Sequence, residues 1–279
     1  MIKIIDGKKI AEEIKRELEK DILALAKKGV IPSLAVILVG EDNASLVYVK
    51  NKERVAKEIG INYRIIKLGD KISQEELEKV IEKLNQDKNI HGFLVQLPLP
   101  AHLDSQNILS KIDPAKDVDC FHPENVGRIF AGNPRFLPCT PAGIIELLKR
   151  NKIEIVGKKV VIIGRSNIVG KPLALMLLAE NATVTICHSK TKDLKAETLQ
   201  ADILVSAVGK AGLIIADMVK KGATVIDVGM NRDNKNKLTG DVDFEEVSKI
   251  AGAITPVPGG VGPMTVVMLM RNVMIAVNN

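Results

Sequence analysis

Short runs of Val, Ile and Leu alternate along the chain with longer stretches in which apolar side chains recur at helical spacing. Strands that alternate with helices join into parallel sheets covered by helices, so this pattern predicts an α/β protein with parallel sheets. The expected strands are Leu34–Val39, Tyr63–Leu68, Gly92–Gln96, Val160–Ile163, Thr183–Cys187, Ile203–Ser206 and Thr224–Val228. The expected helices include Ala44–Ile59, Gln74–Gln86, Lys171–Glu180 and Pro263–Val277.

The alternation stops between Leu97 and Pro141, in a stretch that contains most of the chain's prolines. Proline interrupts helices and strands alike, so we expect two α/β domains that meet near the end of this stretch. The predicted division gives residues 1–139 to the first domain and 140–262 to the second. The pattern alone leaves open which of the two domains the last helix completes.

A length of 279 residues and an apolar fraction of 46% suit two such domains in a globular enzyme. Lys and Arg outnumber Asp and Glu by 40 to 34, and the resulting net charge of +6 favours an anionic ligand. Basic residues never occur more than two in a row, and aromatic residues make up 3% of the chain. Nucleic acid is therefore not expected as a partner.

Neither export nor membrane insertion is expected. The N-terminal residues contain no apolar secretory segment, and the apolar stretch Val261–Val277 is interrupted by Arg271 and Asn272. The three cysteines, Cys120, Cys139 and Cys187, show neither disulfide nor metal-ligand spacing. These features predict a cytoplasmic protein without a membrane partner and without a metal.

A buried strand, a glycine turn and a helix start follow one another between Lys159 and Pro172. Gly164 permits a tight turn and Gly170 permits close packing of the helix, while Ser166 stands where the dinucleotide-binding fingerprint has its middle glycine. Free N–H groups at the helix start can bind a phosphate. The alternative is a turn that uses glycine for its geometry alone.

The next strand distinguishes between cofactors. An NAD site usually has an acidic residue at this strand end, which binds the ribose 2′-hydroxyl. Here Ser189 and Lys190 follow the strand instead, and Arg165 can reach the same place from the first loop. Because these donors suit a 2′-phosphate, the predicted cofactor is NADP rather than NAD. The alternative is a solvated turn at Ser189 and Lys190.

One lysine lies on the apolar face of a predicted helix. At about 100° per residue, Lys52 is the only charged side chain within the apolar arc, with Tyr48 one turn before it and Ser45 one turn earlier. Burial favours the neutral amine, which can act as a base. The alternative is a lysine that extends its ammonium group to solvent at the edge of the sheet.

Several strings, spread in order over nearly the whole chain, resemble the bifunctional methylenetetrahydrofolate dehydrogenase/methenyltetrahydrofolate cyclohydrolase family. They are Ser45-x-x-Tyr48-x-x-x-Lys52, Val95-Gln96-Leu97-Pro98-Leu99-Pro100, Lys116-Asp117-Val118-Asp119, Pro138-Cys139-Thr140-Pro141, Gly164-Arg165-Ser166-x-x-Val169-Gly170-x-Pro172, Cys187-His188-Ser189 and Pro256-Val257-Pro258-Gly259-Gly260-Val261-Gly262-Pro263-Met264-Thr265.

The resemblance implies two reactions in one active site, located in the cleft between the two domains. The first is oxidation of 5,10-methylenetetrahydrofolate by NADP to the 5,10-methenyl compound. The second is hydrolysis of that product to 10-formyltetrahydrofolate. The resemblance also implies a homodimer, a Rossmann-type NADP-binding second domain, and a last helix, 263–279, that belongs to the first domain.

The resemblance assigns roles to individual residues. Lys52 matches the catalytic lysine, Gln96 the glutamine that holds it, Tyr48 the aromatic ring that packs on the folate, and Asp119 the carboxylate that pairs with the pterin. The implied catalytic residues are thus Lys52, Tyr48, Gln96 and Asp119; the substrate-binding residues are Ser45, Tyr48, Asp119, Pro258, Gly259 and Gly260; and the cofactor-binding residues are Gly164, Arg165, Ser166, Ser189, Thr140 and Met230.

Simpler alternatives stand beside three of these assignments. Asp119 could cap a turn, the loop from Pro258 to Pro263 could be a flexible connector, and Thr140 could be the N-cap of a helix that starts at Pro141. The family usually has Gly where this chain has Cys120. If that position requires a positive φ, the cysteine adds strain of order 1 kcal/mol and affects the placement of Asp119. Cys120 is interpreted as a small filler rather than a nucleophile.

Two other classes of protein share part of the pattern. An oxidoreductase of the shikimate dehydrogenase type also combines a catalytic lysine with an NADP-binding domain, but gives no reason for the strings around Asp119 and Gly259. A non-catalytic NADP sensor would not need Lys52 on an apolar face.

Overall fold

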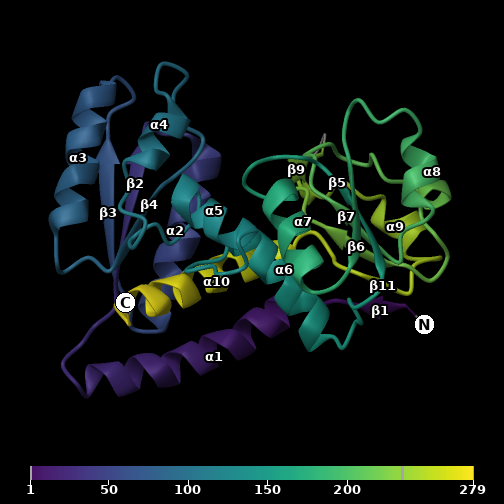
Figure 1. Ribbon diagram of the computed structural model, residues 1–279, viewed down its shortest axis with the longest axis horizontal. Helices are drawn as coiled ribbons and strands as arrows, with labels where there is room; N and C mark the ends of the chain where they lie inside the picture. Colours follow the sequence, from purple (N-terminus) through teal and green to yellow (C-terminus); the bar gives the residue numbers. More distant parts are fainter. Residues whose placement is uncertain (1, 234–235, 279) are drawn as a thin grey trace. The chain divides into compact units, whose positions relative to one another are not determined.

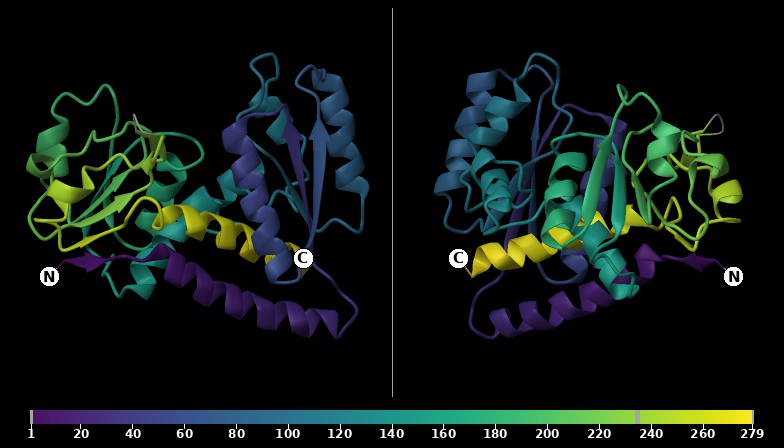
Figure 2. Two further views of the ribbon diagram at one scale, coloured as in Figure 1. Left: turned by 180° about the vertical axis from the view of Figure 1, so that it is seen from behind. Right: turned by 45° about the vertical axis from the view of Figure 1, so that its right-hand side comes forward.

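The computed structural model describes residues 2–233 and 236–278, with the side chains of Asn43 and Ala44 left out of the description. The chain forms two compact units (Figures 1 and 2). Unit 1 comprises Met1–Glu12 and Thr140–Thr265, and unit 2 comprises Glu13–Cys139 and Val266–Asn279. Three helices continue across this division: α1 (Gly7–Ala26), α6 (Cys139–Arg150) and α10 (Val261–Val277).

The predicted division differs from this one at both ends of the chain. The predicted first domain corresponds to unit 2, and the predicted second domain corresponds to unit 1. Residues 1–12 were expected in the first domain but belong to unit 1, because the backbone of Lys3 and Ile4 pairs with Ala253 and Ile254. Residues 263–265 also belong to unit 1. Of the predicted terminal segment 263–279, the final residue, Asn279, lies outside the described residues.

Unit 1 is built on a six-stranded parallel sheet in the order β1-β11-β8-β7-β5-β6. The first strand in sequence after α6 is β5, and the chain adds β6 on one side of it and β7 on the other. The carboxyl ends of β5 and β7 therefore form the switch point at which α/β sheets bind ligands. The strands are β1 (Lys3–Ile4), β5 (Lys159–Ile163), β6 (Thr183–Cys187), β7 (Ile203–Ser206), β8 (Thr224–Asp227) and β11 (Ala253–Ile254).

Shorter elements of unit 1 connect these strands. They are α7 (Gly170–Ala179), α8 (Leu194–Thr198), the 3₁₀ helix η1 (Ala216–Met218), α9 (Phe244–Val247) and the hairpin of β9 (Asn231–Arg232) with β10 (Leu238–Thr239). Aliphatic side chains of the central strands, including Val161, Leu204 and Val225, form the core. Such continuous apolar strands are expected for a parallel sheet buried on both faces.

Unit 2 contains a three-stranded parallel sheet in the order β3-β2-β4. Its strands are β2 (Ser33–Val39), β3 (Asn62–Leu68) and β4 (Gly92–Val95), and its helices besides parts of α1 and α10 are α2 (Asn43–Glu58), α3 (Gln74–Gln86), α4 (Ser105–Ser110) and α5 (Pro123–Phe130). Asp117 extends this sheet by a single parallel bridge to Phe93 of β4. This bridge places the segment that contains Asp119 beside β4, the edge strand that precedes Gln96. The strands and helices predicted from the pattern are confirmed to within two residues at each end.

The start of each long helix in unit 2 has a local cause. The Asp42 carboxylate accepts a hydrogen bond of 2.7 Å from the Ser45 N–H and so caps α2. Ser73 and Glu76 form a reciprocal capping box at α3. A capped first turn sets the angular position of every later side chain on the helix, including that of Lys52 on α2.

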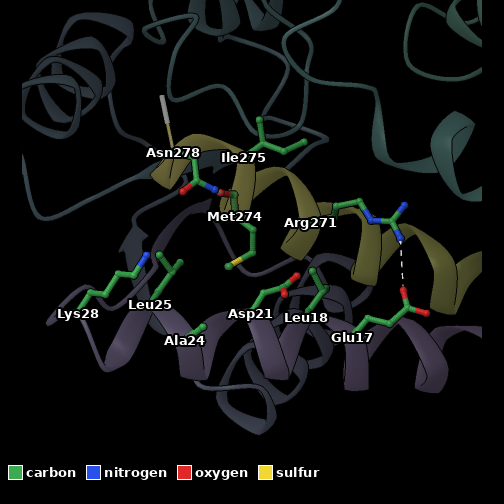
Figure 3. A pocket seen from close by; sticks show the side chains of 10 residues that line it. All are labelled: Glu17, Leu18, Asp21, Ala24, Leu25, Lys28, Arg271, Met274, Ile275 and Asn278. Carbon is green, nitrogen blue, oxygen red and sulfur yellow. Dashed lines mark hydrogen bonds and ion pairs between the residues drawn. The ribbon is translucent and has the colours of Figure 1, made fainter.

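A pocket of about 410 Å³ lies between α1 and α10 in unit 2 (Figure 3). Leu18 and Met274 contribute to its lining, and Glu17 forms an ion pair of 4.0 Å with Arg271 at its edge. Among the described residues that line it, none belongs to the predicted site. None of the helices in the described ranges has both the length and the apolar character needed to span a bilayer.

His91 is expected to make the stability of unit 2 depend on pH. Its Nδ1 atom accepts a hydrogen bond of 3.1 Å from the Ser33 N–H, and burial, assisted by the charge of Lys116, lowers the pKa of its imidazole. A histidine whose folded-state pKa is lowered contributes stability above its unfolded value, near 6.5, and that stability is lost as the pH falls.

The free energy of unfolding of the wild type should therefore fall by about 1 kcal/mol more than that of His91→Asn between pH 7 and pH 5. The asparagine keeps an acceptor for the Ser33 N–H but does not titrate. Urea unfolding at the two pH values measures the difference, and equal pH dependence of the two proteins would contradict the prediction.

Candidate active site

Lys52 of α2 is buried, with 7% of its surface exposed, and its Nζ atom donates to Gln96 Oε1 over 3.0 Å. Gln96 directly follows β4, and its own Nε2 donates to the Leu97 carbonyl over 2.8 Å. The second bond fixes the amide so that its oxygen faces the lysine. A lysine this deeply buried does not extend its ammonium group to solvent, so that alternative is wrong.

Two hydroxyl groups lie on the same helix before Lys52. Ser45 is 4% exposed, and its Oγ atom has no hydrogen-bond partner among the described side chains and backbone groups. Tyr48 is partly buried, and burial raises the pKa of its phenol. Since a buried hydroxyl without a partner is unfavourable, Ser45 is suited to bind a group that the protein does not itself supply.

Asp119 and Cys139 complete this cluster in unit 2. Cys139 Sγ lies 3.5 Å from Asp119 Oδ1. Burial and the nearby Asp119 raise the pKa of the Cys139 thiol well above its usual value, although the charge of Lys52 acts in the opposite direction. The thiol is therefore protonated and can donate to the carboxylate. Composition and spacing did not identify Cys139, although it lies in one of the strings that carry the resemblance.

Cys120 has a positive φ, the conformation in which a cysteine at this position was expected to add strain. Its φ is 63°, and its Sγ donates to the Phe136 carbonyl over 3.2 Å. The residue is fully buried, and burial raises the pKa of its thiol. A buried protonated thiol is a poor nucleophile, which agrees with its interpretation as a filler.

Lys116 and Asp117, which lie in the same sequence string as Asp119, have structural contacts. Lys116 Nζ donates to the carbonyls of Leu84 and Asp87 at the end of α3, over 2.9 and 2.7 Å. Asp117 is buried and accepts from the His122 N–H and from Asn125 Nδ2, over 2.8 and 2.9 Å. These bonds hold the segment whose next polar side chain is Asp119.

In unit 1 the turn after β5 requires glycine because backbone segments approach each other closely there. Gly164 has a φ of 122°, and a Cβ added to it would collide with the Ala207 carbonyl after β7. A Cβ added to Gly170 would collide with the Gly164 carbonyl. Ser166 Oγ accepts from the Val169 N–H over 3.1 Å and more weakly from the Gly170 N–H. These residues fit a pyrophosphate bound at the start of α7.

Arg165 and Ser189 lie at the same edge of the sheet. Strands β5 and β6 pair in register, with Ile163 opposite Cys187, and each of the two residues follows its strand by two positions. Both side chains are exposed. That both side chains contact one phosphate group of NADP stays a prediction.

Three further predicted residues or segments are found in unit 1. Thr140 is not an N-cap, since α6 begins at Cys139; its Oγ1 lies 2.9 Å from Thr265 Oγ1. Gly259 has a φ of 108°, and its carbonyl accepts from the Lys8 N–H over 2.9 Å, so the loop that includes Pro258 and Gly260 is anchored rather than a flexible connector. Met230 is exposed shortly after β8.

Sequence reasoning missed a buried pair of carboxylates in unit 1. Asp241 accepts from the Ser206 hydroxyl, from Asn231 Nδ2 and from the backbone N–H groups of residues 208–210. Asp227 accepts from three backbone N–H groups, and burial raises its pKa to about 6. Together they hold the loops after β7 and β8. No local signal marks them, because every partner but Gly229 is ten or more residues distant.

The two units define a class of protein. A parallel sheet with a glycine turn at its switch point, Arg165 and Ser189 beside it and no acidic residue at the end of β6 is a dinucleotide-binding domain suited to NADP. The other unit carries a buried lysine, an amide and a carboxylate close together. The class is a two-domain α/β oxidoreductase in which one unit binds the dinucleotide and the other carries this buried polar cluster.

Residues 5–119 match the family model described as the catalytic domain of tetrahydrofolate dehydrogenase/cyclohydrolase, and residues 138–279 match its NAD(P)-binding domain. The chain belongs to the tetrahydrofolate dehydrogenase/cyclohydrolase family.

Individual relatives agree. The bifunctional protein FolD of Bacillus licheniformis is 55% identical over 269 residues, which cover 96% of this chain and 95% of that protein. The crystal structure of the bifunctional FolD enzyme of Campylobacter jejuni covers 100% of this chain and 99% of its own, with 50% identity and a TM-score of 0.98. The FolD of Trypanosoma brucei, solved with NADP and an inhibitor, is 41% identical with a TM-score of 0.95 and covers 99% and 97%.

The chain is thus a bifunctional one-carbon folate enzyme. It oxidises 5,10-methylenetetrahydrofolate to 5,10-methenyltetrahydrofolate with NADP and hydrolyses that product to 10-formyltetrahydrofolate. Membership of this family replaces both alternatives, the enzyme of the shikimate dehydrogenase type and the NADP sensor.

Proposed function

We propose that Lys52, held by Gln96, moves the protons of the cyclohydrolase reaction, and that Asp119 binds the pterin of the folate. The observation that carries this proposal is the 3.0 Å hydrogen bond between a lysine that is 7% exposed and the amide of Gln96. A buried amine held by one neutral partner keeps its other hydrogen-bonding positions available to a substrate.

The proposed hydrolysis needs three proton movements. Water adds to the carbon of the methenyl bridge and loses one proton, one ring nitrogen takes up a proton as its bond to that carbon breaks, and the hydroxyl left on the carbon releases its proton as the formyl carbonyl forms. Lys52 can accept the first proton and return one to the nitrogen, while the Gln96 amide keeps the lysine Nζ in one position. Tyr48 packs on the folate and Ser45 offers its unpartnered hydroxyl to it.

The proposed cofactor site comprises Gly164, Arg165, Ser166 and Ser189, with Thr140 and Met230 toward the nicotinamide. NADP, when bound, accepts the hydride that leaves the methylene carbon of the substrate. The glycines at 164 and 170 permit the tight turn and the close helix packing that place the start of α7 beside the strand end, and Arg165 supplies a positive charge for the 2′-phosphate. Pro258, Gly259 and Gly260 are the proposed substrate-binding loop of unit 1.

The role of Asp119 is tested by Asp119→Asn, which keeps the size of the side chain but removes its charge. Losing a charge-assisted hydrogen bond is expected to raise the KM for methenyltetrahydrofolate by at least about tenfold. The KM for NADP should change little, because NADP binds unit 1. An unchanged folate KM would show that Asp119 only caps its turn.

We further propose that the protein is a cytoplasmic homodimer, as the family resemblance implies. Analytical ultracentrifugation of the purified chain distinguishes a dimer from a monomer of 30.3 kDa. Sedimentation as a monomer at micromolar concentration would contradict the proposed assembly.

A further inference from the structure

Asn272 is an exception on the buried side of helix α10. The helix is almost entirely apolar, yet Asn272 is 4% exposed and lies among buried residues such as Met268, Leu269 and Val273. A buried amide is unfavourable unless its polar atoms are paired, and a leucine of similar size would fill the space without that requirement. A polar side chain at this position therefore calls for a specific explanation.

The amide nitrogen of Asn272 bonds to two separate backbone segments. Its Nδ2 donates to the Val118 carbonyl and to the Leu137 carbonyl, each over 2.8 Å. Val118 immediately precedes Asp119, and Leu137 lies two residues before Cys139. Because both N–H groups of one amide are used, the two segments are held at a set distance from each other.

These same two segments meet at the Asp119 carboxylate. Cys139 Sγ lies 3.5 Å from Asp119 Oδ1, and the Asn272 amide lies 3.7 Å from the same sulfur. Both N–H groups of the amide already donate to the carbonyls at 2.8 Å, so the 3.7 Å approach to the sulfur is a weak, shared contact. The single thiol proton has two acceptors within reach, Asp119 Oδ1 and the Val118 carbonyl at 3.6 Å, and that carbonyl already accepts from Asn272. Asp119 is the better acceptor because it can carry a charge.

The residue after Asp119 makes this support more important in the present chain. Cys120 has a φ of 63°, a conformation that is unfavourable for any residue with a Cβ. Strain at that position favours relaxation of the turn that carries Asp119. The two bonds from Asn272 to the neighbouring backbone oppose such a relaxation.

We propose that Asn272 is a positioning residue, which holds Asp119 directly through the Val118 backbone and indirectly through the Cys139 thiol, and so sets the affinity for folate. The inference rests on the proposed function, in which Asp119 binds the pterin. It adds a residue of the last helix, distant in sequence from every other member of the folate site in unit 2.

The test compares Asn272→Leu with wild type in assays of methenyltetrahydrofolate hydrolysis and of NADPH formation. The folate KM is expected to rise by about fivefold, because a displaced carboxylate loses much of a directional, charged hydrogen bond. The kcat at saturating folate and the KM for NADP are expected to change less than about twofold. Leu77→Ala, which truncates a fully buried side chain of α3, is the matched destabilised control and should leave the folate KM unchanged.

A double-mutant cycle with Asp119→Asn identifies the route of the effect. If Asn272 acts through Asp119, Asn272→Leu adds little to the folate KM once Asp119→Asn is present. Additive effects, or a folate KM no higher than that of Leu77→Ala, would overturn the inference while leaving the role of Asp119 intact. An unchanged KM in Asp119→Asn alone would overturn the proposed function and this inference together.

A smaller change keeps the test decisive if the leucine variant does not fold. Asn272→Ser retains one hydrogen-bond donor, but the serine side chain is too short to reach both carbonyls. This variant is expected to raise the folate KM by about twofold to threefold. A folate KM equal to that of wild type in the folded Asn272→Ser protein would contradict the inference.

Discussion

Lys52→Met is expected to lower the rate of methenyltetrahydrofolate hydrolysis by at least about 100-fold, the lower end of the range for general acid–base catalysis. Methionine keeps the length and the apolar stem of the side chain, so a position that is 7% exposed should remain packed and the protein should fold. NADPH formation should fall less, because hydride transfer depends chiefly on alignment of the two reacting carbons. The two rates are measured separately, by methenyl absorbance and by NADPH absorbance, on one preparation.

Lys50→Met is the matched control, since Lys50 lies on the same helix but is exposed. It removes the same charge and should leave both rates within about twofold of wild type. If Lys52→Met hydrolyses methenyltetrahydrofolate at the wild-type rate, Lys52 is a structural residue and the proposed proton transfer is wrong.

Arg165→Ala is expected to weaken the binding of NADP by roughly 10- to 150-fold, which corresponds to the loss of one charged hydrogen-bond partner worth about 1.5–3 kcal/mol. The affinity for NAD should remain nearly the same, because NAD has no 2′-phosphate for the arginine to contact. Arg165 is exposed, so the substitution should not affect folding. Isothermal titration with each cofactor measures both dissociation constants.

Lys195→Ala serves as the control for net charge. Lys195 also lies in unit 1, where it pairs with Asp217 on the surface, and its loss changes the net charge by the same amount. Its dissociation constant for NADP should match that of wild type at physiological ionic strength. Equal losses of NADP and NAD affinity in Arg165→Ala would refute the assignment of Arg165 to the 2′-phosphate.

Some features of the fold could be predicted because their causes are local. The apolar runs that form β5 and β6, and the glycines that follow β5, are contiguous in sequence and carry their own conformational preferences. The helical wheel likewise placed Lys52 on the buried face of α2, because side-chain direction follows from the helical repeat once the helix start is known. The location of the active site between the two domains remains a prediction.

Other expectations failed where the cause lies far along the chain. Residues 1–12 belong to unit 1 because β1 pairs with β11, some 250 residues later, and a two-residue strand has no pattern of its own. Thr140 was considered as an N-cap, but its hydroxyl contacts Thr265 in α10 instead. Composition and spacing did not identify Cys139 either, because its thiol reaches Asp119 from 20 residues further along the chain.

The amino-acid sequence alone predicted the alternation of strands and helices, the glycine turn at Gly164, the absence of an acid after β6 and the position of Lys52. Each of these features depends on residues that are close together in the sequence, within one strand or within one or two helical turns. The folded structure was needed to bring Gln96 to Lys52, Cys139 to Asp119 and Asn272 to the backbone on both sides of that carboxylate. Those contacts join residues between 20 and 154 positions apart. Hydrogen bonds act over about 3 Å, so only packing of the whole unit establishes which distant groups come within reach.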